Sequence, residues 1–373
     1  MIEITAELKD MVLQNGTGTV LFSALNSLNI AVADGYLAKL LNSSKSDPCL
    51  DTISVQLIRS VDAALSSAIN ERDLNDWAGE ALRLICKENT SLTLEQQKSK
   101  LVELEAYGHL KSAFYLRSIV QLPERDGRGG KTPDLRIDDD IYIEAYCPDE
   151  SGPERERVSD ELASQPRDIK LAVSRPVTGS KPLAREFPTN QTIARILGAK
   201  RKNDQTVLDC KNILWLDVKH KLQLMACNTA PIQSVNHGEN TYIECFGLWH
   251  AFYGKVNTSL FPQKRYCLKY DGRSKQDTYL QHGKEGLFRE RLHMSAAIIS
   301  CIDGNVLFLN PWCQSPLDKS EILSLLRIYH FRPEFSFFCK ETLPEEVLAQ
   351  EERIRLLLDP QRVAQLSADG EGK

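Results

Sequence analysis

The sequence predicts a mixed α/β protein, with a mixed central sheet flanked by helices. Proline is nearly absent from the first third: only Pro48 precedes Pro123, and the other fifteen prolines follow. That first third repeats apolar residues at steps of three and four, as helices with one buried face do. After it come short runs rich in apolar and β-branched residues, which indicate strands.

The helical first third is expected to form a domain of its own over residues 1–92. Residues 20–42 and 53–70 carry the clearest helical periodicity. This domain is one place where a protein partner could bind.

A further helix is predicted over residues 93–116, where Thr93 and Gln96 fit a capping box. Its apolar face comprises Leu101, Leu104, Leu110 and Phe114. A short strand is expected in "RSIVQLP", residues 117–123. Later in the chain, "NQTIARILGAKRK" has helical periodicity and "NILWLDV" indicates a buried strand. The order is therefore helix, three strands, helix and strand.

The stretch "PDLRIDDDIYIEAY" predicts two antiparallel strands joined by a turn of three aspartates, residues 138–140. In this register Ile137 faces Ile141, and Asp134 lies opposite Glu144. Like charges at such positions repel each other, whereas a hard divalent cation is commonly held by one or two carboxylates. The alternative is a solvated hairpin whose charges face water.

These residues resemble the PD-(D/E)XK nuclease superfamily. Pro133-Asp134 and Glu144-Ala145-Tyr146 occupy the motif positions, and the predicted element order matches that family's core. The resemblance implies a core over residues 93–335 and an Mg²⁺ or Mn²⁺ cofactor. It assigns the cation to Asp134, Glu144 and the backbone carbonyl of Ala145. For the acidic residue on the preceding helix we choose Glu103 over Glu105.

The sequence departs from the family at Tyr146, where the motif has a catalytic lysine that positions or polarises the attacking water. A phenol is neutral near pH 7, so Tyr146 can donate a hydrogen bond but supplies no charge. Some relatives carry the lysine on the following helix, and Lys200 is the candidate there. The alternative is that Lys200 is a solvated lysine near a helix end.

Six basic residues are candidates for contact with nucleic acid. They are Arg125, Arg128 and Lys131 in a glycine-rich loop, and Lys200, Arg201 and Lys202 on the crossover helix. Both groups could contact phosphates. The alternative is a plain solvated turn for the first group and the decoration of a helix end for the second. Residues 336–373 predict a charged amphipathic helix and a polar tail, a second possible contact for a protein partner.

Composition limits the remaining possibilities. The net charge of -5 argues against a constitutive DNA-binding protein with a basic surface. No apolar run approaches the roughly 20 residues that span a bilayer. The ten cysteines show no metal-binding spacing, and the first residues lack the pattern of an export signal, so we expect a cytoplasmic protein with reduced thiols.

Two functions follow as expectations. The first is a metal-dependent nuclease that hydrolyses the phosphodiester bonds of DNA, with RNA as the alternative substrate, and a role in defence against foreign nucleic acid is implied by the family alone. The second is a catalytically degenerate nuclease fold that serves as a nucleic-acid-binding or protein-assembly module.

Overall fold

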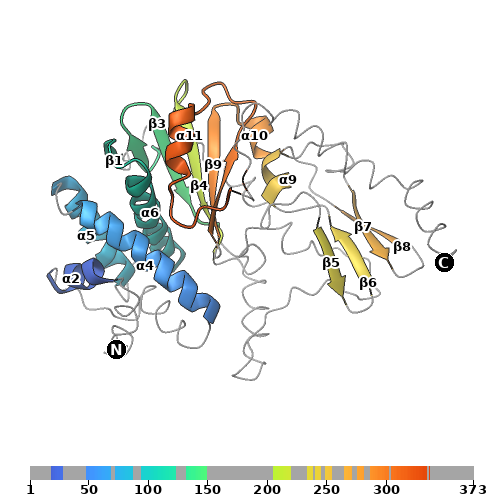
Figure 1. Ribbon diagram of the computed structural model, residues 1–373, viewed down its shortest axis with the longest axis horizontal. Helices are drawn as coiled ribbons and strands as arrows, with labels where there is room; N and C mark the ends of the chain where they lie inside the picture. The colour runs from blue at the N-terminus through green and yellow to red at the C-terminus, as the bar shows by residue number, and fades with distance from the viewer. Residues whose placement is uncertain are drawn as a thin grey trace.

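The computed structural model describes fourteen parts of the chain (Figure 1). These are residues 18–27, 48–68, 72–86, 94–122, 132–148, 205–219, 233–237, 240–244, 248–253, 264–270, 275–280, 286–301, 304–333 and 336.

A six-stranded mixed sheet lies at the centre of the described structure. Its strands are β1 (Ile119–Gln121), β2 (Leu135–Ile137), β3 (Ile141–Tyr146), β4 (Lys211–Asp217), β9 (Met294–Cys301) and β10 (Gly304–Leu309), and they lie in that order across the sheet. Strands β1, β2 and β3 form an antiparallel meander, β3, β4 and β9 run parallel, and β10 is antiparallel to β9. The prediction of a mixed α/β protein is confirmed.

Four helices gather on one side of this sheet (Figure 1). They are α2 (Thr19–Ser27), α4 (Pro48–Ala68), α5 (Arg72–Cys86) and α6 (Leu94–Ala113). The four apolar residues predicted for α6 are all buried, with Phe114 just beyond the end of this helix, and one hydrophobic core joins residues from all four helices to the sheet. This core therefore continues across the domain boundary expected at residue 92.

Helices α4 and α6 pack closely because Gly108 has no side chain. A Cβ atom added at Gly108 would lie 2.0 Å from the carbonyl oxygen of Ser60, a distance at which atoms overlap. The glycine thus sets how near α6 lies to α4.

The β10 side of the sheet is covered by α9 (Leu248–Tyr253) and α10 (Leu287–Glu290). Phe252 and Tyr253 pack against Phe288 and Phe308, with ring centroids 5.0 to 5.5 Å apart. Helix α11 (Lys319–Leu325) follows β10 and has a complete capping box between Asp318 and Glu321.

A second, four-stranded antiparallel sheet was not anticipated from the sequence. It consists of β5 (Gln233–His237), β6 (Asn240–Glu244), β7 (Lys264–Tyr270) and β8 (Lys275–Leu280), and it is set apart from the main sheet in Figure 1. None of the helices in the described ranges combines the length and apolar character that a membrane crossing requires.

The predicted register of the β2–β3 hairpin is confirmed. Ile137 pairs with Ile141 and Leu135 with Ile143, around a turn at residues 138–140. The ladder ends at Leu135, so Asp134 and Glu144 are not a cross-strand pair of the kind expected. Instead, the backbone N–H of Asp134 donates to the carbonyl of Ile143 at 3.0 Å.

Three predicted segments lie outside the described residues. They are the basic loop of residues 123–131, the crossover helix of residues 190–202, and all but Ser336 of the C-terminal segment 336–373.

Candidate functional site

The carboxyl ends of the parallel strands β3, β4 and β9 meet at one edge of the sheet, which we call the carboxyl edge. Ligands of open α/β sheets bind beyond this end of the strands. Residues of two groups lie at or near this edge. The predicted residues Glu144 and Tyr146, with Asp134 beside them, alternate to one face of the sheet, and Asp217 and Ser300, with Glu105 and Lys219, lie on the face covered by α6.

Asp134 is fixed against β3 by its own side chain. One carboxylate oxygen, Oδ2, accepts the backbone N–H of Ala145 at 2.7 Å. The N–H and C=O groups of one residue in an extended strand point to the same side. The carbonyl of Ala145 therefore points towards the β2 side of the strand, where Asp134 lies.

This donor set suits a hard divalent cation in chemistry and in number. Mg²⁺ is bound by one or two carboxylates, with water or substrate phosphates completing its six oxygen ligands. Asp134, Glu144 and the carbonyl of Ala145 would provide two carboxylates and one neutral oxygen. Within the described residues there is no group of three or more His, Cys, Asp or Glu side chains arranged to hold a metal, so such a cation would need the backbone carbonyl and water.

Tyr146 ends β3 and is half-buried, and its backbone pairs with Leu216 of β4. It lies two residues after Glu144, so both side chains project from the same face of the sheet. The phenol is thereby placed on the face that carries the predicted metal ligand.

The two glutamates considered on α6 have different surroundings. Glu103, the residue chosen from the sequence, accepts hydrogen bonds from Lys100 at 3.1 Å within its own helix. Glu105 is 1% exposed and pairs with Lys219, two residues after the end of β4. Its position four residues after Leu101 and four before His109 was the available sign that it lies on the buried face.

A buried group, which we call the Lys219 network, consists of Lys219, Glu105, Asp217 and Ser300. Nζ of Lys219 donates to Glu105 Oε1 at 2.5 Å, Asp217 Oδ2 at 2.7 Å and Ser300 Oγ at 2.7 Å. Burial opposes the charge on Lys219, but the carboxylates of Asp217 and Glu105 outweigh burial and raise the pKa of the lysine. Lys219 is therefore a fixed ammonium, and sequence reasoning missed it.

His109 connects this network to α4 and β4. Its Nε2 lies 2.7 Å from Ser60 Oγ and 3.5 Å from Glu105 Oε1, and its ring stacks on Trp215. A catalytic triad needs the acid on one ring nitrogen and the nucleophile on the other. Here both contacts involve Nε2 and all three side chains are buried, so the arrangement is structural.

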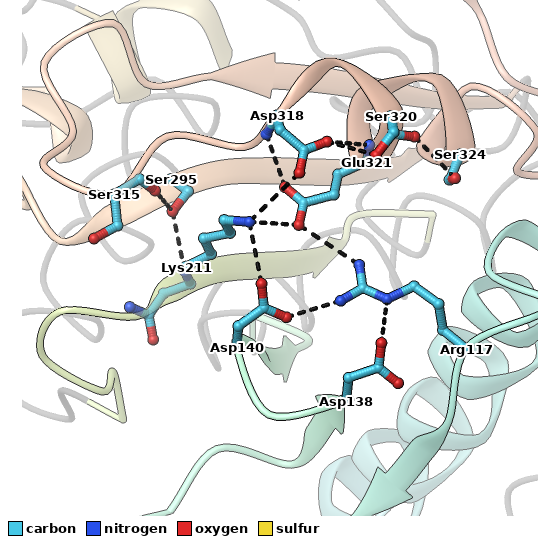
Figure 2. A network of polar contacts seen from close by, with 11 residues as sticks. Arg117, Asp138, Asp140, Lys211, Ser295, Ser315, Asp318, Ser320, Glu321 and Ser324 are labelled. Carbon is cyan, nitrogen blue, oxygen red and sulfur yellow. Dashed lines mark hydrogen bonds and ion pairs between the residues drawn. The ribbon is translucent and has the colours of Figure 1, made fainter.

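Two of the three aspartates of the β2–β3 turn, Asp138 and Asp140, belong to a second polar group at the opposite edge of the sheet, shown in Figure 2. We call it the turn network. Arg117 donates to Asp138 at 2.5 Å and to Asp140 at 2.8 Å, and one nitrogen lies 3.5 Å from Glu321. The hydrogen bond from Arg117 is the main reason that the pKa of Asp138 is lowered.

Lys211, the first residue of β4, completes the turn network (Figure 2). Its ammonium lies 2.5 Å from Glu321, 3.1 Å from Asp140 and 3.7 Å from Asp318. Asp138 has a φ of 48°, a left-handed conformation that aspartate tolerates better than most residues. Asp138 and Asp140 therefore close the turn and, through Arg117 and Lys211, join it to α11, rather than forming part of the predicted site.

The remaining candidates, Arg125, Arg128, Lys131, Lys200, Arg201 and Lys202, lie outside the described residues. Comparisons of the chain with protein-family models, with curated proteins and with solved structures found no match.

Proposed function

We propose that the protein is a metal-dependent nuclease that hydrolyses phosphodiester bonds at the carboxyl edge, with Mg²⁺ or Mn²⁺ as cofactor. One observation carries the proposal: the carboxylate of Asp134 accepts the N–H of Ala145 at 2.7 Å. This bond brings an acid that precedes β2 to the backbone beside Glu144, at the end of a strand in a parallel set. DNA is the expected substrate, ahead of RNA.

Each of the candidate residues has its own role in this proposed hydrolysis. Asp134, Glu144 and the carbonyl of Ala145 would hold the cation, which supplies Lewis-acid activation of the scissile phosphate and its attacking water when bound. Tyr146 donates a hydrogen bond that orients this water. Lys200 or the neighbouring Arg201 and Lys202 contribute positive charge towards the nucleic-acid backbone.

The cleavage assay needs a substitution that preserves the hairpin. Asp134→Ala would remove the acceptor of the Ala145 N–H as well as the charge, whereas Asp134→Asn retains an acceptor oxygen. Asp139→Asn is the matched control, because this aspartate is 95% exposed and lies at the other edge of the sheet. With DNA or RNA and Mn²⁺, wild type and Asp139→Asn should cleave and Asp134→Asn should not. Equal cleavage by all three would exclude Asp134 from catalysis.

The phenol is tested separately. General acid-base groups and their positioning contribute about 10²- to 10⁴-fold in rate. If Tyr146 orients the water, Tyr146→Phe should lower turnover by an amount in that range with little change in substrate binding. A fully active Tyr146→Phe would remove the phenol from the mechanism.

A second candidate function is a binding or assembly module with no catalysis. The observation that favours it is the state of Lys219: this buried lysine is already bonded to two carboxylates, so it cannot replace the cation missing at Tyr146. The module would bind nucleic acid through its basic residues, or a protein through the N-terminal helices or the C-terminal helix.

The salt dependence of binding distinguishes these cases. Each lost phosphate contact flattens the slope of log affinity against log salt by about 0.7 to 0.9. Changing Lys200, Arg201 and Lys202 to alanine should therefore reduce the slope by up to about two to three units in both nucleic-acid functions. A wild-type protein that binds nucleic acid but does not cleave it would support the binding module. If neither wild type nor any variant binds nucleic acid, a protein partner is favoured.

A further inference from the structure

Two side chains that contact His109 each have one buried polar atom without a hydrogen-bond partner within the described structure. These atoms are Nε1 of Trp215 and Oε2 of Glu105. The two side chains are 0% and 1% exposed. The ring of His109 stacks on Trp215 with centroids 5.3 Å apart, and its Nε2 lies 3.5 Å from the other oxygen of Glu105. Both atoms therefore belong to groups that border one imidazole.

The two atoms have opposite hydrogen-bonding roles. An indole N–H only donates, and an ionised carboxylate oxygen only accepts. Burying either without a partner is unfavourable, which is why buried polar atoms of native proteins are almost always paired. A group that satisfies both must accept one hydrogen bond and donate another.

This requirement selects the class of ligand. A metal cation cannot accept a hydrogen bond from the indole. An anion would be repelled, because Glu105 and Asp217 carry two negative charges against the one positive charge of Lys219. A neutral molecule that both donates and accepts fits, and water is the smallest.

We propose that one buried water molecule accepts a hydrogen bond from Nε1 of Trp215 and donates one to Oε2 of Glu105. Both oxygens of Glu105 are then held, one by Lys219 and one by the water. The water extends the Lys219 network to Trp215, whose backbone pairs with Ala145 in the β3–β4 ladder. The inference is independent of the proposed nuclease activity.

Water-contact NMR on the full-length protein tests this. The chain has four tryptophans, so labelling them with ¹⁵N gives few indole signals, and the signal lost in Trp215→Phe identifies Trp215. The Hε1 proton of Trp215 should show a nuclear Overhauser cross-peak at the water frequency. The Overhauser effect should be negative, as expected for a long-lived water. The peak should persist in Ser60→Ala and in Tyr107→Phe, which remove hydroxyl protons that exchange with water.

A missing water cross-peak in the folded wild type, or a peak that disappears in either hydroxyl variant, would overturn the proposal. A high-resolution crystal structure provides the second readout. It should contain a density peak within about 2.7 to 3.2 Å of both Nε1 and Oε2. A protein acceptor bonded directly to Nε1 would equally overturn it.

Discussion

Removing the charge of Lys219 should destabilise the fold far more than removing a lysine from the surface. In Lys219→Met the methionine fills most of the space, but two carboxylates at 2.5 and 2.7 Å and the hydroxyl of Ser300 lose their shared donor. Both carboxylates are 1% exposed, so bulk solvent does not reach them to replace the ammonium.

The magnitude follows from burial. Breaking a buried ion pair by removing one partner costs about 3 to 5 kcal/mol, because the remaining charge stays uncompensated. The control is Lys100→Met, which removes a lysine that is 27% exposed and paired with Glu103 within one helix. Exposed pairs contribute about 0.2 to 1 kcal/mol. The two substitutions should therefore differ by at least 2 kcal/mol.

Urea denaturation followed by circular dichroism at pH 7 measures the free energy of unfolding of both variants. The comparison requires that the slope of this free energy against urea concentration is the same in each. A third variant, combining Lys219→Met with Glu105→Gln and Asp217→Asn, removes the charges together and should recover part of the loss. If the free energy of unfolding of Lys219→Met lies within about 1 kcal/mol of the wild-type value, the lysine is not the buried counter-ion of these carboxylates.

Three further predictions concern the hairpin, the helix crossing and the metal site. The pKa of Asp138 is lowered in the folded state, so its contribution to stability is present above the unfolded pKa and is lost as pH falls through the folded value. In thermal melts, wild type should therefore lose more stability than Asp138→Asn on acidification below about pH 4. Equal losses in the two proteins would contradict this. Gly108→Ala should lower the free energy of unfolding by about 1 to 3 kcal/mol or more through overlap with Ser60, whereas an unchanged urea midpoint would show that α4 and α6 can separate at no cost. Titration with Mn²⁺ should raise the melting temperature of wild type as the concentration exceeds the dissociation constant, but not that of Asp134→Asn with Glu144→Gln, and an equal rise in both would remove the cation from these residues.

The register of the β2–β3 hairpin between Leu135 and Ile143 could be predicted because its determinants are local. Three turn-forming aspartates fix the connection, and the alternation of Leu135, Ile137, Ile141 and Ile143 fixes which face is buried. The strand over "NILWLDV" was equally predictable, because its four central residues, 213–216, form one continuous apolar run.

The polar contacts could not be predicted in the same way. From the sequence alone, Lys219 is expected to be an ordinary solvated lysine after a strand. Only the three-dimensional fold places Glu105 and Ser300 beside it. The roles of Asp138 and Asp140 depend on Arg117 and Lys211, which lie on other elements. A carboxylate's partner is set by tertiary distance, and a single sequence contains no measure of that distance.

The parallel arrangement of β3, β4 and β9 also has a kinetic consequence. Glu144 pairs with Leu214, and Trp215 with Ile298, so the central ladders join residues that are far apart in the chain. Closing such long loops costs entropy before any pairing compensates for it, and folding rates fall as the sequence separation of contacts grows. The antiparallel meander and the α4–α6 pair are local enough to form early. The sheet can be completed only after β9 has emerged from the ribosome, and until then the exposed edge of β4 is a place where chains can associate wrongly.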